Sequence, residues 1–207
     1  MNPLDLGLID FGEAWAIQEQ MAAEVAASNI PETLLLLEHP PVYTIGSGGN
    51  DANILDSSVQ AVRINRGGDV TWHGPGQVVG YPLVDLARRG RDLHRYLRFL
   101  EEFLISTAAD YGISACRIQG KTGIWVDEGK LAAIGVGVRR WVTMHGFALN
   151  VTNDLAPFSA INPCGMADCR VTSLGALSHR APEVGDVKVN IAARFEDMLD
   201  EMLPRVN

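Results

Sequence analysis

Hydrophobic residues along this chain follow two different spacings, which predict both helices and strands. Apolar positions three or four residues apart predict a helix over residues 10–29, with Ala14, Ile17, Met21 and Val25 on one side. The same spacing predicts a helix from Leu93 to about Asp110 and another over residues 187–203. In the last of these, the residues expected on one side are Val189, Ala192, Phe195, Leu199 and Met202.

Short apolar runs predict strands between these helices. The run TLLLLEH lies between Pro31 and Pro40 and is expected to be a buried strand. VYTIG, AVRIN, VVGYPLVDL and the stretch from Trp141 to Leu149 also have strand character. Glu128-Gly129 is expected to be a tight turn between the strands IWVD and KLAAIGV. Strands grouped around hairpins, with helices between the groups, indicate an α+β (mixed α/β) domain and not a regular βαβ alternation.

Length and composition indicate one soluble globular domain over residues 1–207, with 47% hydrophobic and 20% charged residues. No apolar run approaches the roughly 20 residues of a membrane span, and the first residues do not have the pattern of a leader peptide. Three cysteines without the spacing of a disulfide scaffold indicate a reducing cytoplasm. We expect a monomer that does not enter a membrane.

The net charge of −8 argues against nucleic acid as a partner, because binding to phosphates requires a basic face. One basic segment departs from this average, with five arginines among the eleven residues from 88 to 98: Arg88, Arg89, Arg91, Arg95 and Arg98. The favoured interpretation is a solvated helix face and the turn before it. The alternative is a docking surface for a small acidic protein.

The stretch RGGDVTWHGPGQ, from Arg66 to Gln77, has four glycines among twelve residues. Glycines let the backbone approach another group closely and adopt unusual turns. Arg66 before Gly67-Gly68 could hold a guanidinium beside exposed amides, an arrangement suited to an anion or a carbonyl. The other interpretation is a pair of hairpin turns with an incidental His73, and the residues alone leave both open.

Lysine is scarce in this chain, which has three lysines (Lys121, Lys130 and Lys188) and fourteen arginines. Arginine cannot release its proton in a protein, whereas a desolvated lysine can. Lys130 is therefore a candidate for proton transfer, and a solvated lysine is the ordinary alternative. QGKTG at residues 119–123 is not a phosphate loop, because that motif requires a glycine where the chain has Ala115.

Cys164 in INPCGMADCR has four possible roles. A metal site with Cys169 is disfavoured, because the C-x4-C pair has no second pair of ligands at metal-binding spacing. A disulfide between the two cysteines would require oxidising surroundings. A buried inert thiol is the ordinary state of a free cysteine. The remaining role is a nucleophile, which needs a nearby cation or a helix N-terminus. For Cys169 the inert state is favoured.

Several stretches, taken in order, resemble the signatures of the lipoyl(octanoyl) transferases: RGGDVTWHGPGQVVGYPLVDL, GKLAAIGVGVRRWVTMHGFALNV and INPCG. LEHPPVYTIG resembles the opening strands of this family, and the resemblance is strongest over residues 33–175. It implies the fold of the biotin and lipoate protein ligase catalytic domain, a mixed sheet with flanking helices. The implied activity moves an octanoyl group from acyl carrier protein to a lysine of a lipoyl domain. Such domains occur in 2-oxoacid dehydrogenases and in the glycine cleavage H protein.

The resemblance also implies roles for particular residues. Cys164 would carry the acyl group as a thioester and Lys130 would be its catalytic partner. The substrate-binding residues would be Arg66, Gly67, Gly68, Asp69, Val70, Thr71, Trp72, His73, Ala133, Ile134, Gly135, Gly146, Phe147 and Ala148. Trp72 replaces a tyrosine common in the family, and IGSGGND lacks a basic residue often found there. The resemblance gives no role to Cys169 or to the basic segment.

Three other functions compete with octanoyl transfer. A lipoate–protein ligase would need ATP and no cysteine nucleophile, and the turn HGPGQ and Cys164 favour the transferase over it. An amidotransferase would share the cysteine but take octanoate from another lipoylated protein. A binding module would hold acyl chains or carrier proteins without catalysis, and the presence of both Lys130 and Cys164 argues against it. Neither a cofactor nor a metal is expected.

Overall fold

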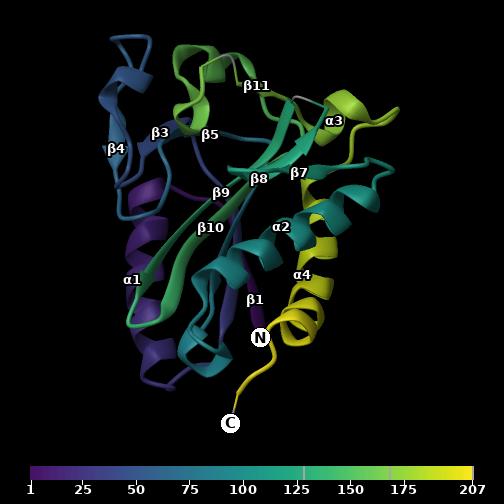
Figure 1. Cartoon of the computed structure of the whole chain (residues 1–207). Helices are drawn as coiled ribbons and strands as arrows, with labels where there is room; N and C mark the ends of the chain where they lie inside the picture. Colours follow the sequence, from purple (N-terminus) through teal and green to yellow (C-terminus); the bar gives the residue numbers. More distant parts are fainter. Residues whose placement is uncertain (128, 168, 207) are drawn as a thin grey trace.

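The structure is a computed structural model, and it describes residues 1–127, 129–167 and 169–206. A large sheet lies between two helical layers (Figure 1). Helix α1 (Phe11–Ala26) covers one face of this sheet, and helices α2 (Leu93–Ala109) and α4 (Val184–Met202) cover the other face. This arrangement confirms the predicted mixed α/β fold with a mixed sheet and flanking helices.

Within the described residues, the large sheet has the strand order β1-β2-β6-β10-β9-β8-β7, and β11 pairs with β9. The pairs β1–β2 and β9–β11 are parallel, and the other neighbours are antiparallel. The strands are β1 (Asn2–Leu8), β2 (Thr33–Glu38), β6 (Gln77–Leu83), β7 (Cys116–Ile118), β8 (Lys121–Val126), β9 (Gly129–Arg139), β10 (Val142–Asn150) and β11 (Arg170–Val171).

Strand β2 explains why TLLLLE has no polar alternation. Successive side chains of a strand point to opposite faces of the sheet. Leu34 and Leu36 therefore pack in the core beneath α2 and α4, while the intervening leucines pack in the core beneath α1. Because helices cover both faces, every leucine of the run is buried. The predicted buried strand is confirmed.

The predicted helix over residues 10–29 is confirmed as α1. It begins after Asp10, whose carboxylate accepts hydrogen bonds from the backbone N–H groups of Gly12 and Glu13. The helix buries Ala14, Ala22 and Val25 against strands β6 and β10. It thus fixes the position of Phe11 in its first turn, over the middle of the sheet.

Helices α2 and α4 pack against each other through aromatic rings. The ring of Phe195 lies 5.2 Å from that of Phe99 and 4.9 Å from that of Phe103, both with edge-to-face geometry. The predicted face of α4 is partly wrong, because Val189 is 69% exposed. The buried face has a four-residue spacing that starts two positions earlier: Val187, Ile191, Phe195 and Leu199. Two residues correspond to about 200° around a helix, so Val189 points to solvent.

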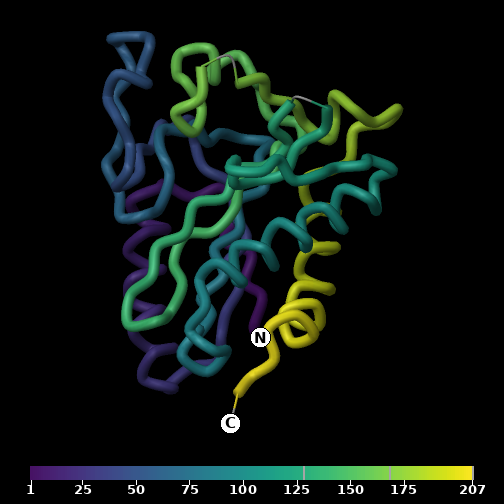
Figure 2. Tube along the Cα trace, viewed as in Figure 1, coloured from purple at the N-terminus to yellow at the C-terminus, as the bar shows by residue number. Residues whose placement is uncertain are grey.

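A second, smaller sheet has the order β4-β3-β5 and lies at one end of the large sheet. Its strands are β3 (Val42–Ile45), β4 (Ala61–Arg63) and β5 (Val70–His73). Strand β5 was not predicted, because the glycines on both sides of VTWH favour turns. The segments 46–66 and 156–167 lie side by side at this end (Figure 2), where Ile54 and Ile161 form a β-bridge.

The remaining described elements are short. They are α3 (Leu174–Leu177) and the 3₁₀-helices η1 (Asp51–Asn53), η2 (Leu86–Arg89), η3 (Ala156–Ala160) and η4 (Pro163–Gly165). The strands β8 and β9 form the predicted antiparallel pair. Gly129, however, belongs to β9 and pairs with Val126, so it is not a turn residue. Glu128, the other residue of the expected turn, lies outside the described residues.

The five arginines of the basic segment contact partners within the chain. Arg89 is 2% exposed, and its guanidinium lies 2.6 Å from Glu32 and 2.8 Å from Asp200. The other contacts are Arg88 with Asp85, Arg91 with the ring of Trp141, Arg95 with the carbonyl of Met202, and Arg98 with Glu101. Arg88, Arg91, Arg95 and Arg98 are exposed, as expected for a solvated helix face and turn, whereas Arg89 is buried and connects η2 to Glu32 and to Asp200 on α4.

Candidate active site

Lys130 and Cys164, which are 34 positions apart in the sequence, meet in the structure. The Nζ atom of Lys130 on β9 donates a hydrogen bond to Sγ of Cys164 on η4, at 2.7 Å. Lys130 is only 3% exposed, so the alternative of a solvated lysine is wrong. The thiol of Cys164 is half-buried. An amine and a thiol in direct contact can exchange a proton, which is the arrangement that activates a cysteine nucleophile.

The turn that presents Cys164 has an unusual backbone. Cys164 lies in the left-handed region, with φ 57° and ψ 26°, and Gly165 follows with φ 72°. A side chain in this region costs roughly 1–2 kcal/mol. Backbone hydrogen bonds hold the conformation, from Asn162 N to Asn53 O at 2.7 Å and from Gly165 N to Asn162 O at 2.9 Å. The sulfur therefore points toward Lys130 and away from the surface of the turn.

Asp69 supports the same turn from the glycine-rich segment. Its Oδ2 accepts a hydrogen bond of 2.7 Å from Nδ2 of Asn53, whose carbonyl holds Asn162. A Cβ atom added at Gly165 would lie only 2.8 Å from Oδ2 of Asp69. Asp69 thus helps to position the Cys164 thiol indirectly, through Asn53 and the turn that carries Cys164. The absence of a side chain at Gly165 leaves room for the Asp69 carboxylate.

Lys130 lies against strand β8. Its Nζ is 5.1 Å from the centre of the Trp125 ring, close enough for a cation–π interaction. A Cβ atom added at Gly123, which has φ 118°, would lie 2.9 Å from Cε of Lys130 and 2.5 Å from the carbonyl oxygen of Ala132. Trp125 and Gly123 together determine where the amine lies.

The substitution Gly123→Ala is expected to slow alkylation of Cys164 by iodoacetamide about tenfold, because the new methyl group displaces the amine that stabilises the thiolate. The rate is measured by intact mass. Gly120→Ala is the matched control: Gly120 also has a left-handed φ of 77°, but an added Cβ there meets no atom within 4 Å. Equal slowing in both variants would mean that backbone strain, and not displacement of Lys130, causes the effect.

Cys164 borders a cavity that we call the inner cavity. It is lined by Phe11, Ile64, Arg66, Gly68, Asp69, Thr71, His73, Tyr81, Ala133, Ile134, Gly135, His145, Gly146, Phe147, Ala148 and Cys164. A second space, the outer cavity, shares Gly68, Ile134, Gly135 and Cys164 with it. The thiol therefore lies where the two cavities meet.

Most of the substrate-binding residues implied by the resemblance line the inner cavity, but Gly67, Val70 and Trp72 do not. Strand β5 alternates, so Thr71 and His73 face the cavity while Val70 and Trp72 face the small core on the other side. There the ring of Trp72 packs against Phe158 at 5.6 Å. Gly67 lines the outer cavity instead.

Four lining residues were missed by sequence reasoning: Phe11, Ile64, Tyr81 and His145. His145 directly precedes Gly146-Phe147-Ala148, and this adjacency is the signal that could have identified it. Phe11 and Ile64 lie outside the stretches that resemble the family. Tyr81 lies within one, on β6, but the sequence does not specify which face of that strand borders the cavity. These three reach the cavity through the packing of α1 and β6 and through the loop that follows β4.

Arg66 provides a fixed positive charge in the cavity wall. It is 8% exposed, and its Nη2 donates to both the carbonyl oxygen and Oγ1 of Thr44, at 3.0 and 2.9 Å. Burial lowers the pKa of Arg66, and the nearby thiol of Cys164 opposes this. Because a guanidinium begins from a pKa far above neutrality, Arg66 stays charged. It favours negative charge on the neighbouring sulfur or on a substrate oxygen.

The histidines of the inner cavity are neutral at pH 7. Burial, followed by the nearby His39, lowers the pKa of His73 to about 3. Burial and then Arg66 lower the pKa of His145 to about 4. The Nδ1–H of His73 donates to Oε1 of Gln77 at 2.8 Å, because that amide donates its own N–H groups elsewhere. The wall is thus apolar and uncharged except at Arg66 and Asp69, which suits an acyl chain with its carbonyl near the thiol.

Tyr81 is also held uncharged. Nδ1 of His39 contacts the carbonyl oxygen of Ile9 at 2.8 Å, so this nitrogen carries the proton. Nε2 of His39 must then accept the hydrogen bond of 2.8 Å from the hydroxyl of Tyr81. Burial raises the pKa of Tyr81. The hydroxyl of Tyr81 is therefore bound to His39, and Tyr81 lines the cavity without a charge.

The structure bears on the alternatives for the cysteines. All three are free thiols, with Cys164 and Cys169 half-buried and Cys116 exposed. Burial raises the pKa of Cys169, which keeps that thiol protonated. Across residues 1–127, 129–167 and 169–206 there is no group of three or more potential metal ligands. Over the same residues, no helix combines the length and apolarity required to cross a bilayer.

The fold and this site define a catalytic domain of the lipoate and biotin protein ligase type. A lipoate-protein ligase A solved with bound ATP superimposes with a TM-score of 0.70 at 16% identity, covering 96% of this chain and 84% of that one. A bipartite lipoate protein ligase from Thermoplasma acidophilum, solved in a study that includes its E2 lipoyl domain, superimposes with a TM-score of 0.64 at 16% identity. The superposition on the archaeal ligase covers 98% of this chain and 84% of that one.

The sequence comparison narrows the class. The family model of the lipoyl protein ligase A/B catalytic domain matches residues 10–196, and the chain belongs to this family. An octanoyltransferase of Geotalea uraniireducens is 66% identical over 204 residues, which cover 99% of this chain and 95% of the relative. The protein is therefore an acyltransferase, as the sequence predicted.

Proposed function

We propose that this enzyme moves an octanoyl group from an acyl carrier protein to a lysine of a lipoyl domain, through a thioester on Cys164. The observation that carries the proposal is the hydrogen bond of 2.7 Å between Lys130 and Cys164, at the mouth of an apolar cavity. The name of the relative from Geotalea uraniireducens supports octanoyl as the acyl group.

The first step loads the enzyme. Lys130 accepts the proton of the Cys164 thiol, and the resulting thiolate attacks the carbonyl carbon of the donor thioester. The bond between this carbon and the carrier sulfur breaks as the new thioester forms. The departing thiolate then takes the proton back from the Lys130 ammonium. Octanoyl-Cys164 and a free carrier thiol result, so protons and bonds balance without another reactant.

The second step unloads the enzyme. The neutral amine of the acceptor lysine attacks the carbonyl carbon of octanoyl-Cys164, and Lys130 takes the proton that this amine loses. Collapse of the intermediate breaks the bond to Cys164 Sγ, which recovers the proton. Because a thioester is converted to an amide, the exchange is downhill and requires no nucleotide.

Each step develops negative charge on the carbonyl oxygen, and the glycine-rich turn supports a site for it. The N–H of Gly67 donates to the carbonyl oxygen of Val136 at 2.9 Å, so of these two glycines only Gly68 can offer its N–H to an oxyanion. Gly68 lines both cavities beside Cys164. A single donor of this kind is typically worth about 3 kcal/mol, and the charge of Arg66 adds to it.

Nucleotide dependence tests the proposal against the ligase alternative. We expect octanoyl transfer from the carrier to a lipoyl domain in the absence of ATP and magnesium, and no modification from free octanoate or lipoate when both are added. Electrophoretic mobility or intact mass of the lipoyl domain measures the product. Modification that requires ATP and free acid would identify a ligase. An octanoylated H protein as the better donor would identify an amidotransferase.

The expected acceptors are the lipoyl domains of 2-oxoacid dehydrogenases and the glycine cleavage H protein. The archaeal neighbour studied with its E2 lipoyl domain supports an acceptor of this kind. A reducing cytoplasm is the proposed setting, because the mechanism requires the free thiol. We further propose that residues 1–207 act as one catalytic domain and as a monomer.

A further inference from the structure

The large sheet opens between strands β8 and β9, and the outer cavity lies in this opening. The two strands pair from Val126 and Gly129 as far as Ile124 and Ala132. Beyond that point β9 continues against β10, while the start of β8 turns toward β7. The outer cavity is lined on one side by Gly120, Lys121 and Thr122, and on the other by Ile134, Gly135 and Val136.

Cys164 joins this opening to the inner cavity, since it lines both together with Gly68, Ile134 and Gly135. The inference that follows rests on the proposed function. If the octanoyl chain fills the inner cavity, its carbonyl lies at Cys164, and the sulfur side of the donor thioester must leave through the other space. We propose that the outer cavity binds the thiol-linked arm of the donor, a phosphopantetheine chain in extended conformation.

Beyond Ala132 the edge of β9 is not paired with β8, and it can pair with such an arm. The carbonyl oxygen of Val136 accepts a hydrogen bond from Gly67 N, so the polar groups of Val136 point into the opening. Backbone polar groups alternate in direction along a strand, and the N–H and C=O of Ile134 therefore point the same way. A phosphopantetheine arm contains secondary amides, which can pair with Ile134 as an added strand would.

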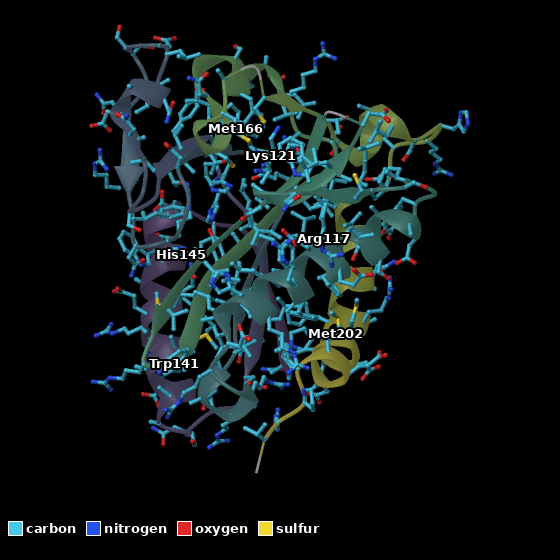
Figure 3. All side chains as sticks on the ribbon, in the orientation of Figure 1. Arg117, Lys121, Trp141, His145, Met166 and Met202 are labelled. Carbon is cyan, nitrogen blue, oxygen red and sulfur yellow. The ribbon has the colours of Figure 1, made fainter. Side chains whose placement is uncertain are left out.

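The outer end of the opening carries a matching charge. Lys121 is exposed, and its Nζ lies 5.4 Å from the centre of the Trp125 ring, on which Lys130 also packs. Lys121 and Met166, which both line the outer cavity, lie at the same end of the molecule, whereas Trp141 lies at the opposite end (Figure 3). An ammonium at this entrance suits the phosphodiester at the far end of the arm.

The first test blocks the opening and compares two donors. Thr122→Trp fills the outer cavity, and Thr122→Val keeps the original size. Formation of octanoyl-Cys164 is followed by intact mass, using octanoyl-carrier and the octanoyl thioester of 2-mercaptoethanol, which lacks the arm. For Thr122→Trp, we compare kcat/KM for the carrier with kcat/KM for the short thioester. This ratio is expected to fall at least about tenfold, because a blocked arm loses one or two hydrogen bonds to the enzyme. In Thr122→Val it is expected to stay unchanged.

The second test examines the charge. Lys121→Gln is expected to raise KM for octanoyl-4′-phosphopantetheine about fivefold, with little change for octanoyl-pantetheine, because an exposed ion pair contributes up to about 1 kcal/mol. Arg63→Gln is the control, since Arg63 is an exposed cation on β4 in the smaller sheet and does not line the outer cavity. Equal effects on both thioesters would overturn the assignment of the phosphate to Lys121.

The outcomes separate this inference from the proposed function. If the wild-type enzyme forms no adduct with either donor, the thioester mechanism itself fails. If both donors form the adduct and Thr122→Trp slows them equally, the mechanism stands and the outer cavity is not the arm site. If Thr122→Trp slows only the discharge of octanoyl-Cys164 to a lipoyl domain, the opening admits the acceptor lysine and our assignment is wrong.

Discussion

The substitution Cys164→Ser is expected to abolish the octanoyl adduct and to reduce transfer at least about a thousandfold, as is typical when a covalent nucleophile is lost. Serine fits the left-handed turn as cysteine does, so the fold should persist, but its hydroxyl does not give up a proton to Lys130 as a thiol does. The measurement is intact mass after brief incubation with octanoyl-carrier and no acceptor. The wild-type adduct should disappear after a hydroxylamine wash, as a thioester does.

Cys169→Ser provides the matched control. Cys169 is half-buried like Cys164, but burial raises the pKa of its thiol, and its sulfur contacts the carbonyl oxygen of Arg170 at 3.7 Å. This variant should form the adduct at the wild-type rate. Two results would exclude the Cys164 intermediate. One is an adduct that persists in Cys164→Ser. The other is a wild-type enzyme that forms no adduct although it still modifies the lipoyl domain.

Replacing Lys130 separates its charge from its proton transfer. Lys130→Met keeps the apolar stem against Trp125 but removes both, and Lys130→Arg keeps the charge but cannot accept a proton. Both variants are expected to form the adduct about 100- to 10,000-fold more slowly, the usual contribution of a general base. In Lys130→Met the rate should continue to rise with pH, because the thiolate then forms only by loss of its proton to water.

Thermal unfolding provides the control for Lys130. Loss of an amine that is 3% exposed should leave the melting temperature of Lys130→Met unchanged or higher, because a buried charge is costly to desolvate. A slow but well-folded variant thus places the defect in the chemistry. If Lys130→Arg reacts at the wild-type rate, Lys130 acts through its charge alone and another group moves the proton.

The elements that sequence predicted well are those whose burial leaves a pattern in the residue order. The leucine run of β2 and the apolar spacing of α1 and α2 are local, and both were identified. Strands β1 and β5 were missed for different reasons. In β1, Leu4 and Leu6 are half-buried and alternate with exposed neighbours, but the strand lies at the edge of the sheet and this short pattern was overlooked. The glycines around β5 conceal a short strand whose partner, β3, lies elsewhere in the sequence.

The site was predicted from sequence resemblance, and its geometry required the fold. Cys164 and Lys130 were singled out as a pair, but the burial of Lys130 depends on Gly123 and Trp125 across β8. The glycine-rich segment was treated as one lining stretch, whereas the alternation of β5 turns Val70 and Trp72 away from the cavity. Long-range packing, which one sequence does not specify, also brings in Tyr81.

The internal contacts of the basic segment have a consequence for how the enzyme meets its donor. Because Arg88, Arg89 and Arg98 already pair with carboxylates of the chain, much of the segment's positive charge is balanced before another protein approaches. A chain of net charge −8 then repels an acidic carrier at long range. Added salt screens this repulsion over about 10 Å at 0.1 M. Encounter with the carrier should therefore become faster as ionic strength rises from low values, the reverse of electrostatic steering.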